Sequence, residues 1–203
     1  MAKISKSVFW IIIFASALFI AIQSSAYIYA PLSEVRLKPD DGEALAFRLH
    51  GLGGILALVF GPLQFIGYLR KNHAIVHHWI GGLYVVAVAI GATGAVIMAA
   101  NPIGNEANSF AFYMLAALWV LSTAQGFRFA LQRNFTEHKK WMLRSYALTF
   151  AAVTLRFGIG GLIFGLSFPE AAAYTVVAWA SWTINLIILE WFLLPALMRR
   201  SAK

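Results

Sequence analysis

The sequence predicts an all-α membrane protein, a bundle of six transmembrane helices forming one domain over residues 1–203. Hydrophobic side chains make up 61% of the 203 residues, the mean hydropathy is +0.74, and only 12% of the residues are charged. A soluble domain cannot bury so much apolar surface in its core. The connections between the apolar segments are short, so they leave no room for a second, soluble domain.

Six apolar segments are each long enough to cross a bilayer as a helix, which takes about 20 residues. They comprise residues 8–30, 48–69, 77–99, 108–131, 139–166 and 172–198. The first segment follows Lys3 and Lys6, as in a signal peptide. Its apolar stretch is longer than that of a typical signal peptide, so we expect an uncleaved first span.

Basic residues gather on one side of the predicted membrane, before the first span, after the second, around the connection of the fourth and fifth, and after the sixth. They are twelve of the sixteen in the chain: Lys3, Lys6, Arg70, Lys71, Arg128, Arg133, Lys139, Lys140, Arg144, Arg199, Arg200 and Lys203. The opposite loops carry six of the eight acids: Glu34, Asp40, Asp41, Glu43, Glu106 and Glu170. The positive-inside rule therefore predicts that both termini are cytoplasmic. The pI near 10.0 then reflects topology and does not indicate a nucleic-acid partner.

The chain contains no cysteine. Disulfides, thiolate metal sites and thiol catalysis are thereby excluded. The sequence also lacks a P-loop, a dinucleotide-binding glycine motif, a G-x-S-x-G elbow and an H-E-x-x-H zinc motif. Any chemistry must come from histidine, carboxylate, arginine or methionine side chains, or from a bound cofactor.

The spacing H-x-x-G-G occurs twice, and a helix advances by about 100° per residue, so each copy begins a stripe along one helix face. In the second span the stripe comprises His50, Gly53, Gly54, Ala57, Gly61 and Gln64. In the third span it comprises His78, Gly81, Gly82, Val85 and Ala89. A third polar face in the fifth span comprises His138, Met142, Ser145, Thr149, Ala152 and Arg156.

Glycines beside a histidine have two explanations. Glycine allows transmembrane helices to pack closely, with the histidines hydrogen-bonded at headgroup level. Alternatively, the missing side chains leave room for a flat macrocycle whose iron the imidazole ligates. His78 and His138 lie at equal depth near the inner face, so they are the predicted ligands of a haem b. The adjacent His77 points about 100° away from the glycines and remains the alternative to His78.

The outer half of the bundle offers a second candidate site around His50 and Arg156. A charged residue within a span costs several kcal/mol unless it is paired or reaches water. We therefore expect Arg156 to face His50 or an anionic group, or to extend to the headgroups. The fourth span contains no histidine, which leaves Met114 as a possible partner of His50 for iron. Near the inner face, Glu190 is expected to pair with Arg144.

Three stretches of the chain resemble the bacterial membrane family catalogued as domain of unknown function 2306. They are HGLGGILALVFGPLQF, HWIGGLYV and EHKKWMLRSYALTFAAVTLR, within roughly residues 48–165. The resemblance implies a bacterial cytoplasmic membrane and a set of pattern positions: His50, Gln64, His78, His138, Arg144, Tyr146 and Arg156.

The chain is also similar, more loosely, to six-helix dihaem cytochromes of the b561 type. Those proteins use histidine pairs on the second and fourth spans and on the third and fifth spans. Only the second of these pairs has a counterpart here, in His78 and His138.

These observations predict a haem b protein that transfers electrons within or across the cytoplasmic membrane, as a membrane oxidoreductase or part of one. Its expected partners are the lipid bilayer and a quinone or a redox protein. One alternative is a copper or zinc site formed by the histidines with Glu190, because imidazole suits both metals. A second alternative is a small transporter or accessory subunit without a cofactor. The sequence leaves the donor, the acceptor and the oligomeric state open.

Overall fold

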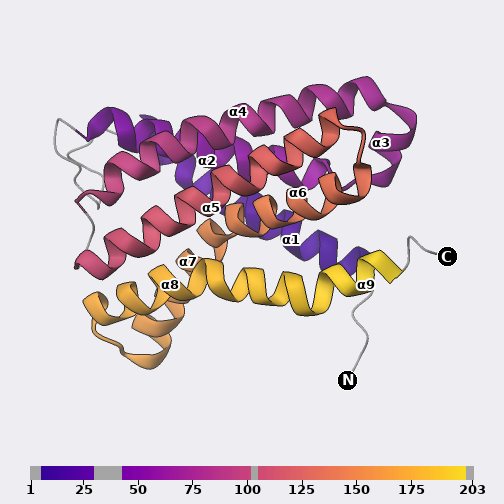
Figure 1. The fold of residues 1–203 in the computed structure, drawn as a ribbon. Coiled ribbons are helices and arrows are strands. Elements are labelled where there is room, and N and C mark those ends of the chain that lie inside the picture. Colours follow the sequence, from indigo (N-terminus) through magenta and orange to yellow (C-terminus); the bar gives the residue numbers. More distant parts are fainter. Residues whose placement is uncertain (1–5, 30–42, 102–104, 200–203) are drawn as a thin grey trace.

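The computed structural model describes residues 6–29, 43–101 and 105–199, and every regular element in these ranges is a helix (Figure 1). The elements are α1 (Lys6–Tyr29), α2 (Ala44–Leu63), α3 (Gly67–Asn72), α4 (Ala74–Ala99), α5 (Glu106–Leu131), α6 (Phe135–Thr149), α7 (Ala151–Gly160), η2 (Gly161–Gly165), α8 (Glu170–Ile188), η3 (Leu189–Leu193) and α9 (Leu194–Arg199). The two η elements are single π-helical turns that extend α7 and join α8 to α9.

Six stretches of the described residues are long and apolar enough to cross a membrane. They are Val8–Ala26, Ala44–Leu63, Ala74–Ala99, Glu106–Leu131, Phe135–Gly165 and Glu170–Leu197. The outer surface of the bundle suits hydrocarbon, because large apolar side chains such as Ile11, Trp79 and Phe164 are exposed. The predicted fold class, an all-α protein with six membrane spans, is confirmed.

The second span ends earlier than the sequence predicts. We expected one helix over residues 48–69, but α2 ends at Leu63. Pro62 lies in the last turn of α2 and, having no N–H, leaves the carbonyl oxygen of Leu58 without its usual helical partner. The N–H groups of Gln64, Phe65 and Ile66 donate to carbonyl oxygens three residues back, at 3.1 to 3.2 Å, which tightens the final turn. The chain then forms the separate short helix α3.

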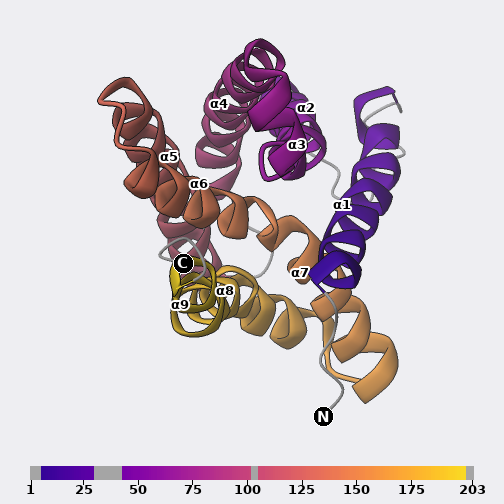
Figure 2. The same ribbon diagram turned by 90° about the vertical axis from the view of Figure 1, so that its right-hand side faces the viewer.

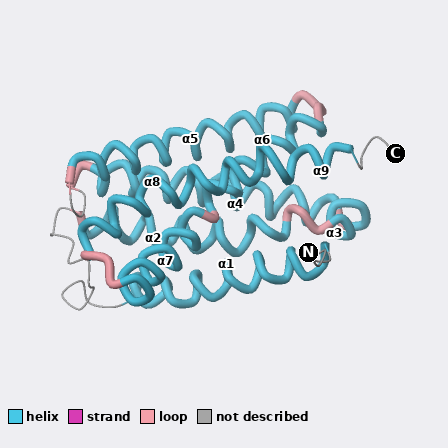
Figure 3. Tube along the Cα trace, turned by 90° about the horizontal axis from the view of Figure 1, so that it is seen from below, coloured by secondary structure: helices cyan, strands magenta, loops and turns pink. Residues whose placement is uncertain are grey.

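The long helices run side by side, with the turns gathered at the two ends (Figures 1 and 3). α2 packs along α4, α5 along α6, and α7 along α8, while α1 packs mainly against α2 (Figure 2). We call the end that carries α3 and the α5–α6 turn the α3 end. The opposite end, with the turn between η2 and α8, is the α8 end.

The backbones of α2 and α4 touch. A Cβ atom added to Gly53 would lie 2.3 Å from the backbone nitrogen of Gly91, and one added to Gly94 would lie 2.3 Å from the carbonyl oxygen of Ala46. No side chain fits at such separations, and helices in a membrane gain packing energy by this close approach. Further towards the α3 end, the core is filled by large side chains, including Tyr84, Trp119, Met142 and Tyr146.

The orientation of the bundle is a prediction with a direct test. The α3 end carries most of the described basic residues, among them Arg70, Lys71, Arg133 and Lys140. Glu34, Asp40 and Asp41, and the basic Lys3, Arg200 and Lys203, lie outside the described residues. We expect the α3 end in the cytoplasm, because short loops rich in lysine and arginine remain there.

A fluorescent protein fused after Lys203 should therefore be fluorescent, and alkaline phosphatase fused there should be inactive. The matched control is a fusion at Ser167, in the turn between η2 and α8, where the two reporters should give the reverse result. Phosphatase activity from the fusion after Lys203 would show that the bundle has the opposite orientation.

Candidate functional site

His138 lies in the first turn of α6, at the α3 end of the bundle. Asn134 caps this helix, its side chain accepting a hydrogen bond from the N–H of Glu137 at 3.2 Å. The ring nitrogen Nδ1 of His138 is 2.8 Å from the carbonyl oxygen of Gly126 on α5. A carbonyl oxygen can only accept, so Nδ1 carries the proton and donates. In the neutral ring, Nε2 is left with a lone pair.

His77 faces the same region from α4 and contacts Gln64, which follows α2. In the amide orientation that satisfies both of its ends, Gln64 donates to Nδ1 of His77 at 2.9 Å and to its carbonyl oxygen at 3.2 Å. The amide oxygen then accepts from the N–H of Gly81 at 3.2 Å. The His77 ring lies within electrostatic range of His138. His77 and Gln64 thus meet at this end of the bundle, where His138 is also located.

His78 lies on the other side of α4. It is exposed and lines an open pocket of about 340 Å³ together with Ile75, Trp79 and Gly82. The predicted stripe of His78, Gly81, Gly82, Val85 and Ala89 therefore does not form one inward face. The inward face passes through His77, Gly81, Tyr84, Val88 and Gly91. The contact of Gly91 with Gly53 and the burial of Tyr84 set this rotation of α4.

The two glycines of each H-x-x-G-G motif have different surroundings. The first glycine is packed, Gly53 against the backbone of α4 and Gly81 against the side chain of Gln64. The second glycine is open, because a Cβ atom on Gly54 or Gly82 would meet nothing within 4 Å. Each open glycine lies four residues after its histidine and so shares a helix face with it. In each copy of the motif, one glycine thus packs against a neighbouring element, and the other leaves open space on the same helix face as the histidine.

His50 occupies the α8 end of α2. Its Nδ1 lies 3.0 Å from the carbonyl oxygen of Gly91, so this ring also holds its proton on Nδ1 and leaves a lone pair on Nε2. Arg156 lies within electrostatic range of His50. Its guanidinium donates to the hydroxyl of Ser24 on α1 and to the carbonyl oxygen of Ala152, both at 3.0 Å.

A buried hydrogen-bonded network joins α4, α5 and α6 between these two ends, and the sequence did not reveal it. The hydroxyl of Tyr84 lies 2.7 Å from that of Ser145 and 2.9 Å from that of Thr149. Thr149 accepts from the indole N–H of Trp119 at 2.9 Å, and Thr123 lies 2.7 Å from Ser145. Ser145 and Thr149 belong to the polar stripe predicted for the fifth span. On α4 and α5 the sequence does not mark the network residues, since single hydroxyl and indole groups are common in apolar spans.

Two further pattern residues, Arg144 and Tyr146, lie next to the network on α6. Arg144 forms a two-point ion pair with Glu190 of η3, at 2.6 and 3.1 Å, and its guanidinium lies 4.7 Å from the centre of the Trp141 ring. The predicted ion pair is thus confirmed. The ring of Tyr146 fills the space that a Cβ on Gly61 would occupy, and its buried hydroxyl has no hydrogen-bond partner among the described residues.

The described residues contain no group of three or more His, Cys, Asp or Glu side chains placed to hold a metal ion. Glu190 is engaged by Arg144 and so is not gathered with the histidines. His50, His77 and His138 instead lie singly, each with one ring nitrogen in a hydrogen bond and the other without one among the described residues. A hydrogen bond of this kind orients a histidine towards a metal or a polar ligand.

Comparison with known proteins gives one match. No curated protein and no solved structure matches the chain. A family model described as "Predicted membrane protein (DUF2306)" matches residues 47–193, which is most of the chain and contains both histidine regions, Gln64, the network and the Arg144–Glu190 pair. The chain belongs to this family of membrane proteins.

Proposed function

We propose that the protein binds haem b between α4 and α6 near the α3 end and transfers electrons within or across the cytoplasmic membrane. The observation that carries the proposal is the hydrogen bond between His138 and the Gly126 carbonyl oxygen. It holds the ring in the form whose Nε2 can bind iron, and histidines that ligate a metal typically donate their other N–H to such an acceptor. A haem with two imidazole ligands alternates between ferric and ferrous iron and carries one electron at a time.

The second ligand in this proposal is His77, because it lies partly buried on the inward face of α4, whereas His78 is exposed. In the preferred amide orientation, Gln64 donates to Nδ1 of His77, which places the proton on Nε2. Binding of iron at Nε2 requires the proton on Nδ1 of His77 and an acceptor for it. Rotating the Gln64 amide would supply that acceptor, but it would place the amide oxygen against the His77 carbonyl oxygen and the amide NH2 against the Gly81 N–H. His138 therefore fits as it stands, whereas His77 fits only if Gln64 gives up these two hydrogen bonds.

His78 is the alternative second ligand. Neither of its ring nitrogens has a hydrogen-bond partner in the part of the chain that the structure describes, and Gly82 leaves an open notch beside it. Its exposed position requires a haem that is seated at the lipid-facing side of α4. A copper or zinc site has less support, because the carboxylate that would complete it is paired with Arg144.

Electrons that cross the membrane would need a second site towards the α8 end, and His50 is the candidate. The Gly91 carbonyl oxygen fixes its tautomer, and Gly54 leaves open space on the same helix face. Arg156 could balance a carboxylate there, such as a haem propionate. A quinone or a redox protein would supply or remove the electrons.

The test is the visible spectrum of the purified protein and of four single variants. The wild type should show a low-spin b-type spectrum that sharpens on reduction with dithionite. His138→Ala and His77→Ala should each give a high-spin spectrum or lose the haem, because the iron loses one imidazole. His73→Ala is the control, since the His73 side chain is exposed and its ring lies beside that of Tyr68.

His78→Ala distinguishes the two neighbouring histidines. It should leave the spectrum unchanged if His77 is the ligand, and it should be the only one of the two with an effect if the lipid-facing site is used. A purified wild-type protein that is colourless and contains no iron would refute the proposal, as would an unaltered low-spin haem in His138→Ala.

A further inference from the structure

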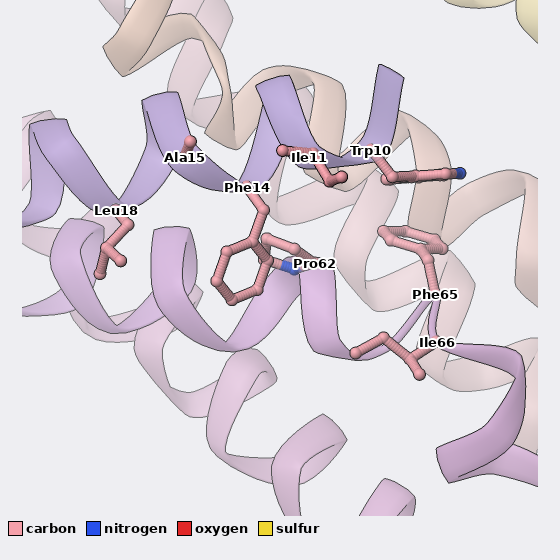
Figure 4. Close-up of a pocket in the computed structure, with 8 residues that line it drawn as sticks. All are labelled: Trp10, Ile11, Phe14, Ala15, Leu18, Pro62, Phe65 and Ile66. Atoms are coloured by element: carbon pink, nitrogen blue, oxygen red, sulfur yellow. The ribbon is translucent and has the colours of Figure 1, made fainter. Parts of the chain in front are cut away.

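An apolar groove runs along the outside of the bundle between α1 and the end of α2 (Figure 4). Its volume is about 680 Å³. The ring of Trp10 stacks on Phe65 at 5.5 Å between centroids and closes the groove at the α3 end. All of its lining residues are apolar or aromatic, and they come from α1 between Trp10 and Leu18 and from Pro62, Phe65 and Ile66.

The groove lies where α2 ends. The chain leaves the helix after Leu63, and Pro62, Phe65 and Ile66 form the wall of the groove opposite the face of α1 from Trp10 to Leu18. This face is about 12 Å long, at 1.5 Å per residue. In a membrane, such a groove opens to the hydrocarbon layer.

Positive charge begins directly where the groove ends. Ile66 is the last lining residue, and the N–H of Arg70 donates to its carbonyl oxygen at 3.3 Å, so Arg70 lies one helical turn further along. Arg70 and Lys71 form the basic last turn of α3, and both side chains are exposed. An apolar groove that ends at two exposed cations complements a molecule with a hydrocarbon chain and an anionic headgroup.

We propose that this groove and α3 bind one anionic phospholipid. An acyl chain lies along α1 over Ala15 and Leu18, and the phosphate lies at Arg70 and Lys71. The charge of the headgroup decides selectivity, because a zwitterionic lipid offers the same chain but no net charge to the two cations. The groove contains none of the proposed haem ligands, although Arg70 lies within electrostatic range of His77.

The experiment measures lipid binding to the full-length, delipidated protein by native mass spectrometry. The probes are phosphatidylglycerol, phosphatidylcholine and ubiquinone, each added from detergent micelles. We expect one tightly bound phosphatidylglycerol, with phosphatidylcholine bound about tenfold more weakly. Arg70→Gln combined with Lys71→Gln should remove this preference, and Arg133→Gln, at an exposed cation in the α5–α6 turn, should retain it.

The groove itself is tested by Ala15→Trp, which fills it from an exposed position on α1. This variant should lose the tightly bound phosphatidylglycerol. Ala26→Trp is the matched control, the same change at an exposed residue of α1 that does not line the groove. If Ala15→Trp does not give a monodisperse protein, Ala15→Leu provides a smaller filling of the same space.

Equal binding of the two phospholipids, retention of phosphatidylglycerol by a folded groove-filling variant, or tighter binding of ubiquinone would each overturn the proposal. The haem spectrum is recorded on the same samples. A wild-type protein that contains haem but shows no lipid preference would refute the lipid site alone, and a colourless protein with selective lipid binding would refute the haem proposal alone.

Discussion

Replacing Gly53 with alanine should force α2 away from α4 and destabilise the protein, whereas the same change at the neighbouring Gly54 should not. A Cβ on Gly53 would lie 2.3 Å from the nitrogen of Gly91 and 2.5 Å from the carbonyl oxygen of Ala87. These are backbone atoms, which cannot move without the whole helix. We expect a cost of about 3 kcal/mol, the upper end of the range for overpacking.

Gly54→Ala is the matched control, because the added Cβ meets nothing within 4 Å. Alanine also favours a helix over glycine by about 1 kcal/mol. The two variants therefore shift stability in opposite directions, which thermal unfolding in detergent, followed by circular dichroism, can measure. Equal stability of Gly53→Ala and the wild type would show that α2 and α4 are further apart than the structure places them.

The visible spectrum of the Gly54→Ala variant provides a second measurement. If haem occupies the open notch beside His50, the added methyl group should perturb its spectrum while the fold stays intact. Gly82→Ala is the corresponding test beside His78, and its added Cβ atom also has no neighbour within 4 Å. An effect at only one of these glycines would indicate which histidine lies against the macrocycle.

The six spans could be predicted from the sequence because a membrane span is set by length and mean hydropathy, which are properties of the chain alone. The predicted boundaries differ most at the second span, which begins at Ala44 and ends at Leu63, and at the start of the fifth, which begins at Phe135. Apolar residues continue through Ile66 and Leu69, so hydropathy alone did not mark the break that Pro62 introduces. The groove between α1 and the end of α2 was therefore not predicted from the sequence.

The rotation of α4 could not be predicted in the same way. A transmembrane helix is apolar on all sides, since lipid and protein interior are similar solvents. The glycines next to His78 suggested an inward face there, but Gly82 is exposed and the buried residues are Tyr84, Val88 and Gly91. The hydroxyl of Tyr84 needs the partners that α6 supplies, and this requirement appears only when the helices are assembled.

The ion pair was predictable because charges within spans are rare and must find partners. Arg144 and Glu190 lie at similar depth on α6 and η3, and their side chains are 24% and 38% exposed. In a membrane this exposure is mainly to lipid, so water does not screen the pair as it would on a soluble protein.

Glu190→Leu should destabilise the protein by about 3 kcal/mol, because it leaves the Arg144 guanidinium without its counter-ion inside a span. Arginine cannot lose its proton, so the charge remains. Arg144→Met should cost less, since the Glu190 carboxylate can take up a proton. The double variant carries no charge at either position and should recover most of the loss seen in Glu190→Leu.

The measurement is unfolding of the three variants in mixed micelles, with Lys140→Met as a control for removing a cation that pairs locally with Glu137, three residues earlier on the same helix. That control should change stability by less than about 1 kcal/mol, the usual value of an exposed pair. If the double variant were as unstable as Glu190→Leu, the loss would come from packing of η3 and not from the unpaired charge. If Glu190→Leu were as stable as the wild type, the Arg144 charge would be stabilised by the Trp141 ring and the headgroup region instead. The ion pair would then not be what holds η3 in place.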